Sequence, residues 1–126
     1  MRSLDPRRLA PRIRLDGLCG VVSRRELSYA ALLDLSALGL RIERLFDPAS
    51  ASRQVQLEIE LPGVDEIVWA GGEVTFAHLS PMGGVHLDGQ PRLWCRAGIR
   101  IDRVARRDRR LLRDYVIETR RAQRPA

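Results

Sequence analysis

A strict alternation of apolar and polar residues between Gln54 and Leu61 is the strongest constraint on the fold. The apolar members of this alternation are Val55, Leu57, Ile59 and Leu61. Because successive side chains of a strand point to opposite faces, a period of two predicts a β-strand with one face in a core and one in water. Pro62 and Gly63 are expected to end that strand.

Five further segments are predicted as strands from their apolar content and the turn-prone residues around them. They are residues 13–22, 27–34, 40–42, 67–78 and 93–101. Gly39 is expected to turn the backbone sharply, and Gly71–Gly72 to interrupt the strand that contains it. Residues 47–53 and the Gly/Pro-rich stretch 79–91 are expected to be loops. Short strands at close spacing favour an antiparallel sandwich or a closed barrel, which removes sheet edges.

The period of the apolar residues changes near the C-terminus. Between about residues 104 and 122, one apolar stripe recurs at helical spacing, and it consists of Leu111, Leu112, Tyr115, Val116 and Thr119. This pattern predicts a helix that docks its stripe on the barrel. With 126 residues the chain has the size of one domain, so residues 1–126 are expected to form a single domain with no room for a catalytic partner domain.

Basic charge is concentrated at the two ends of the chain. All 22 basic residues are Arg; residues 1–14 hold five Arg and one acid, and residues 103–126 hold nine Arg and three acids. No apolar run is long enough to span a bilayer and no secretory signal is apparent, so we expect a cytoplasmic protein without membrane insertion. Cys19 and Cys95 lie far apart in predicted strands and are expected to be buried free thiols.

Two short motifs stand out. Arg8 and Arg12 form an Arg-x-x-x-Arg spacing, which occurs seven times in this arginine-rich chain and is weak by itself. Asp34, Ser36 and Gly39 form Asp-x-Ser-x-x-Gly, which should arise by chance only ~0.04 times in a chain of this length. The order of the two motifs in the chain and the gap between them make the pair more specific than either motif alone.

Together with the run from Ala97 to Asp102 and the Arg-rich helix after it, the two motifs resemble a PilZ domain over most of the chain. The resemblance implies a mainly β fold, a six-stranded antiparallel β-barrel over about residues 13–102 with a C-terminal helix over about 104–122. It also implies that residues 1–12 form a ligand-binding arm. In that family the two motifs bind the bacterial second messenger cyclic di-GMP.

The residue types suit such a ligand, which carries two phosphates and two guanines. Arg8 and Arg12 provide planar forks for phosphate oxygens or the guanine edge, and Pro11 favours an extended arm. By resemblance Asp34 accepts from guanine N1 and N2, Ser36 donates or accepts, and Gly39 keeps the turn open to a base.

Two more residues enter through the resemblance. An Arg at the place of Arg7 is associated in the family with an intercalated pair of ligand molecules, so two cyclic di-GMP per chain are expected. Phe76 either stacks on a guanine, as an aromatic residue in that strand does in some members, or faces the core.

Plainer readings stand beside these. Taken alone, Arg8 and Arg12 are typical of a solvated tail, and Asp34 with Ser36 of a self-capped Asx turn. The C-terminal Arg cluster is a solvated face, or it meets an acidic partner or nucleic-acid phosphates, although it lacks the interleaved aromatic residues of a nucleic-acid site. His78 and His86 do not form a metal site, and no cofactor is expected.

No catalytic constellation is present in the sequence, so we expect a receptor and not an enzyme. It would relay the level of cyclic di-GMP to an unidentified protein partner through ordering of its N-terminal arm. The alternatives are an adaptor of the same fold that does not bind the ligand and, less favoured, a nucleic-acid-binding barrel.

Overall fold

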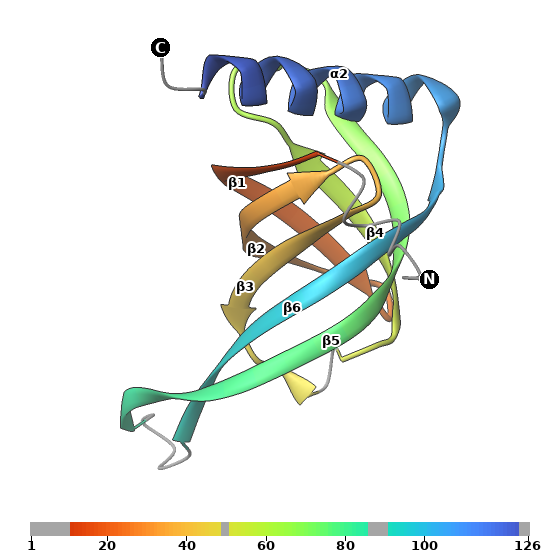
Figure 1. The fold of residues 1–126 in the computed structure, drawn as a ribbon. Helices are drawn as coiled ribbons and strands as arrows, with labels where there is room; N and C mark the ends of the chain where they lie inside the picture. The colour runs from red at the N-terminus through yellow and green to blue at the C-terminus, as the bar shows by residue number, and fades with distance from the viewer. Residues whose placement is uncertain (1–10, 49–50, 86–90, 124–126) are drawn as a thin grey trace, which may run out of the picture.

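The computed structural model describes residues 11–48, 51–85 and 91–123 (Figure 1). Six antiparallel strands close into a barrel in the order β1-β2-β3-β6-β5-β4, and one helix follows them. Their bounds are β1 (Arg12–Ser23), β2 (Glu26–Ser36), β3 (Gly39–Leu45), β4 (Gln54–Glu60), β5 (Ile67–Val85), β6 (Pro91–Val104) and α2 (Arg106–Ala122). The expected six-stranded barrel with a C-terminal helix is confirmed.

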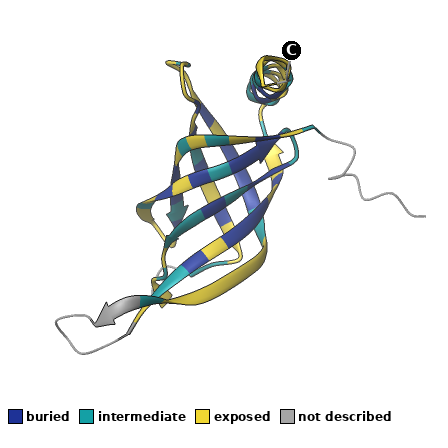
Figure 2. Cartoon of the chain, turned by 60° about the vertical axis from the view of Figure 1, so that its left-hand side comes forward, coloured by how far each residue is buried: buried dark blue, intermediate teal, exposed yellow. Residues whose placement is uncertain are grey.

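The barrel interior is filled by the alternate residues of each strand, as the stripes of buried and exposed positions in Figure 2 show. In β4 the side chains of Val55, Leu57 and Ile59 are buried, so the strand predicted from the strictest alternation has the predicted inner face. Cys19 and Cys95 are free thiols in this core. Burial raises the pKa of Cys19 to about 12, and burial also raises that of Cys95.

Helix α2 crosses the upper end of the barrel in Figure 1 and packs against β1, β2 and β5. Its predicted stripe is the docked face, because Leu112 and Val116 are fully buried while Leu111 and Tyr115 are partly buried. Side-chain hydrogen bonds also hold the helix in place. Tyr115 donates its hydroxyl to the carbonyl oxygen of Pro62 at 2.9 Å, and the Gln123 side chain donates to the carbonyl oxygen of Arg14 at 3.3 Å.

The long loop expected at residues 79–91 is wrong, because β5 continues to Val85 and β6 begins at Pro91. Pro81 favoured a loop in the sequence, but a strand tolerates a proline when the ring nitrogen of that proline faces away from the neighbouring strand. In Figure 1 the two strands continue below the barrel as a two-stranded extension, the β5–β6 extension.

Two glycines serve a different purpose from the one expected. Gly72 does not interrupt β5, which bulges and continues there; a Cβ at this position would lie 2.6 Å from the Ile99 side chain. Gly39 has no positive φ, and a Cβ there would lie 2.7 Å from the carbonyl oxygen of Ile99. Both glycines are therefore required by the close approach of β6 and not by a sharp turn.

We expect Leu112→Ala to lower the free energy of unfolding by about 2–5 kcal/mol, because it leaves a cavity under the helix. The matched control is Leu111→Ala, which removes the same atoms from a partly buried neighbour and should cost less. Urea unfolding measures both. Equal small losses would mean that α2 is not docked through the face containing Leu112.

Candidate functional site

Arg12 and Asp34, one residue from each sequence motif, form an ion pair between the first residue of β1 and the end of β2. Arg12 Nη1 lies 2.5 Å from Oδ1 of Asp34, and Nε of Arg41 pairs with Oδ2 of the same carboxylate. The Asp34 side chain is 2% exposed, whereas those of Arg12 and Arg41 are 33% and 43% exposed. The carboxylate thus sits beneath two guanidinium groups that still reach the surface.

Strand register explains why these side chains converge. β1 and β2 pair Arg12 with Ser36, and β2 and β3 pair Asp34 with Arg41. The β2–β3 ladder shifts between Leu32 and Asp34. Such a bulge re-aims side chains, so both Leu32 and Leu35 are buried in the core although three positions separate them, while Asp34 turns toward the arginines.

Asp34 and Ser36, to which the resemblance assigns ligand contacts, are buried in the structure, at 1% and 0% exposed. Asp34 makes no self-capped turn, because both of its oxygens hold arginines. Ser36 makes the turn instead: its hydroxyl oxygen accepts from the backbone N–H groups of Leu38 at 3.2 Å and Gly39 at 3.1 Å. Asp34 therefore orients two cations, and Ser36 shapes the turn beside them.

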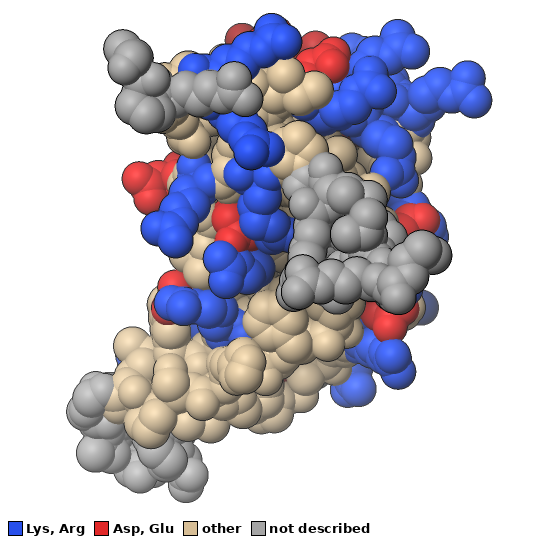
Figure 3. All heavy atoms as spheres, viewed as in Figure 1, with Lys and Arg blue, Asp and Glu red and all other residues tan. Residues whose placement is uncertain are grey.

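A surface basin of about 580 Å³ opens beside this ion pair. It is lined by Arg12, Gly39, Leu40, Arg41, Thr75, Phe76, Gly98, Ile99 and Arg100. Three strands thus contribute one arginine each, and Figure 3 shows arginines gathered on the barrel above a stretch of mostly uncharged surface. Arg100 also pairs with Glu73 at 3.1 Å.

Phe76 is 38% exposed and belongs to the rim of the basin, so the reading that placed it in the core is wrong. Its ring covers Gly98 of β6, where an added Cβ would lie 2.1 Å from a ring carbon. Only glycine fits under the ring without displacing it. The basin therefore combines cationic forks with an aromatic face, which suits an anion that carries flat bases.

Sequence reasoning missed Arg41, Arg100 and Gly98. A usable signal existed for Arg41, because Leu40 and Ile42 on either side of it are apolar and a strand would turn Arg41 outward. Arg7 and Arg8, the other predicted ligand residues, lie outside the described residues, so the structure brings together Arg12, Asp34, Ser36, Gly39 and Phe76 alone of that set.

We expect Asp34→Ala to lower the free energy of unfolding by about 2–3 kcal/mol, because two guanidinium groups lose their anion and a buried position loses its hydrogen bonds. Asp102→Ala is the control, since it removes a 3.2 Å ion pair with an exposed Arg103 and should cost less than about 0.5 kcal/mol. Chemical denaturation compares the two. A stability loss for Asp34→Ala no larger than that of the control would contradict the structural role given to Asp34.

Similar solved structures share the barrel and helix. The chain aligns with the PilZ domain of YcgR from Escherichia coli, solved with c-di-GMP, at 17% identity and a TM-score of 0.68, covering 92% of this chain and 93% of that one. It aligns with the Bacillus subtilis inhibitor of motility MotI/DgrA at 15% identity and a TM-score of 0.69, covering 99% of this chain and 55% of that one.

The PlzA protein of Borreliella burgdorferi, solved in complex with c-di-GMP, aligns at 7% identity and a TM-score of 0.59, covering 91% of this chain and 53% of that one. The chain thus spans about half the length of MotI and PlzA. No curated protein sequence matches it. The family model of the PilZ domain matches residues 6–118. The chain belongs to the PilZ domain family.

Proposed function

We propose that this protein is a receptor for cyclic di-GMP that binds the ligand in the basin beside Asp34. The observation that carries the proposal is the pair of guanidinium groups, Arg12 and Arg41, which one buried carboxylate orients toward an open surface with an aromatic rim. Family membership supports it, and so do the structures of two relatives that contain c-di-GMP.

Each group in the basin has a role in this proposal. Arg12 and Arg41 donate to phosphate oxygens or to the O6 and N7 atoms of a guanine, and Phe76 stacks on a base. Asp34 acts as a positioning residue for the two forks, and its carboxylate accepts from a guanine only if an arginine moves away. Ser36 fixes the turn on which the ligand rests, and Gly39 lets β6 approach closely beside it. Arg8 closes over the ligand from the arm.

The proposed output is contact with a protein partner and not catalysis. Arg12 begins β1, and two residues later the carbonyl oxygen of Arg14 accepts from Gln123 at the end of α2. A ligand that orders the arm before Arg12 therefore acts next to the helix and changes the surface that a partner meets. Within the described part of the chain, no helix has the length and apolar character needed to cross a membrane.

We expect Arg12→Ala to weaken cyclic di-GMP binding by about 10- to 100-fold, as removal of a charge-assisted, two-pronged contact does. Arg113→Ala removes the same charge from an exposed helix position and should leave the affinity nearly unchanged. Titration calorimetry gives both constants. If the unmodified protein takes up no cyclic di-GMP, the adaptor alternative holds and the proposal fails.

Arg7 sets the expected stoichiometry. Two stacked ligand molecules bring four phosphate charges together, and a further guanidinium offsets their repulsion. We expect two cyclic di-GMP per chain for the unmodified protein and one for Arg7→Leu, with binding retained. The titration plateau reports the number directly. One ligand per unmodified chain would refute the role of Arg7 and leave the site at Arg12 intact.

A further inference from the structure

Within the described part of the chain, the outer edge of β5 has no partner strand over much of its length. β4 pairs with β5 only as far as Glu73, while β6 continues beside β5 from there to Val85. The last backbone contact on the other side of β5 is the hydrogen bond from the Val74 N–H to the carbonyl oxygen of Arg53, at 2.8 Å. Beyond it, no strand among the described residues pairs with that side of β5. An open edge of this kind presents a row of backbone donors and acceptors to an incoming chain.

The sequence of this edge lacks the charged side chains that commonly protect an edge strand, and its one proline, Pro81, lies toward the far end. From Val74 to Val85 there is no Asp, Glu, Lys or Arg, although such residues make up 30% of the chain. Edge strands are commonly protected by charged side chains that prevent pairing with other chains. Here Leu79 is 47% exposed, and in Figure 3 the part of the β5–β6 extension that is not grey is mostly uncharged on the side in view, although β6 itself contains Arg92 and Arg96.

Pro81 identifies which backbone groups face the open side. The β5–β6 ladder runs without a shift from Phe76 to Pro81, and a proline in such a ladder keeps its ring nitrogen away from the paired neighbour. Residues two apart in a strand present their N–H and C=O groups to the same side. Ala77 and Leu79 lie four and two residues before Pro81, so their backbone N–H and C=O groups also face the open edge.

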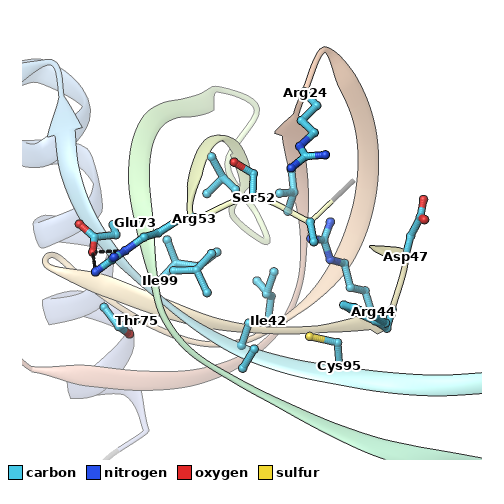
Figure 4. Close-up of a pocket in the computed structure, with 17 residues that line it drawn as sticks. Arg24, Ile42, Arg44, Asp47, Ser52, Arg53, Glu73, Thr75, Cys95 and Ile99 are labelled. Atoms are coloured by element: carbon cyan, nitrogen blue, oxygen red, sulfur yellow. Dashed lines mark hydrogen bonds and ion pairs between the residues drawn. The ribbon is translucent and has the colours of Figure 1, made fainter. Parts of the chain in front are cut away.

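A cavity of about 720 Å³ lies directly inside this edge (Figure 4). Thr75 and Ala77 of β5 line one side, and its apolar floor includes Ile42, Val55 and Ile99. Arg24, from the β1–β2 turn, and Ala51 and Ser52, which precede β4, also line the cavity. Arg53 lies beside β5, where its carbonyl oxygen accepts from Val74 at 2.8 Å.

We propose that the β5 edge from Thr75 to Pro81 binds one extended, uncharged segment of a partner protein by strand addition, with the alternate apolar side chains of that segment in the cavity. Main-chain pairing to an edge with side-chain pockets beneath it is a recurrent mode of peptide recognition. A single strand fits better than the β5 of a second copy, which brings its own β6 along, because Arg53 is hydrogen-bonded to β5 at Val74 and Ala51 and Ser52 line the same cavity, so residues 51–53 bound the space beside the edge. The inference does not depend on ligand binding in the basin.

The test uses a capped peptide of alternating valine and threonine with an aspartate at each end for solubility. In an extended peptide the valine amides all face one side and the threonine amides the other. Two further peptides carry N-methyl groups on only the valines or only the threonines. We expect saturable NMR shifts at the Ala77 and Leu79 amides of the full chain, with an affinity loss of at least tenfold for one methylated peptide and of less than threefold for the other.

On the protein, Leu79→Pro removes one N–H from the open edge and should reduce binding at least tenfold, whereas Leu79→Ala keeps that N–H and should stay within threefold. If Leu79→Pro fails to fold, the difference in affinity between the two methylated peptides still tests whether the partner segment pairs with the β5 edge. Absence of shifts at millimolar peptide, or equal affinities of the two methylated peptides, would overturn the proposal. So would a dimer in sedimentation experiments that Leu79→Pro dissociates, because a second copy would then occupy the edge.

Discussion

Asp34 places a carboxylate between two arginines, and the geometry of the basin depends on that contact. A buried carboxylate is costly unless it is paired and hydrogen-bonded, so folding fixes Arg12 of β1 and Arg41 of β3 around an anion on β2. The two guanidinium groups lose little further freedom when a ligand arrives, and such preorganisation favours affinity. Two cations on one anion also leave a positive charge directed at the basin.

The fold was predictable wherever one period of side chains extends through a whole element. The alternation in β4 and the stripe in α2 both survive in the structure, because nothing in either element shifts the phase: Val55, Leu57 and Ile59 face the core, and Leu112 and Val116 dock the helix. Local sequence carries this information completely, since burial alone decides which face turns inward.

The site was less predictable because bulges change the phase. The β5–β6 ladder shifts between Val74 and Phe76, so Val74 packs against the core while Phe76, two residues on, faces the basin. The shift between Leu32 and Asp34 acts likewise on β2. The partners of Asp34 are also distant in sequence, 22 residues back at Arg12 and seven ahead at Arg41. Local periodicity does not reveal a register shift, and the 22-residue separation places Arg12 outside any short window that contains Asp34.

The bond from Gln123 to the carbonyl oxygen of Arg14 has an electrostatic consequence. It holds the last turn of α2, with Arg120 and Arg121, close to the start of β1, which contains Arg12 and Arg14. Like charges held together by packing raise the energy of the fold. In the proposed receptor, a multivalent anion bound at Arg12 would relieve that repulsion and stiffen the junction between β1 and α2. Charge of any origin would then act on this end of the barrel, and discrimination among anions would rest on the ring of Phe76 and the directed hydrogen bonds around it.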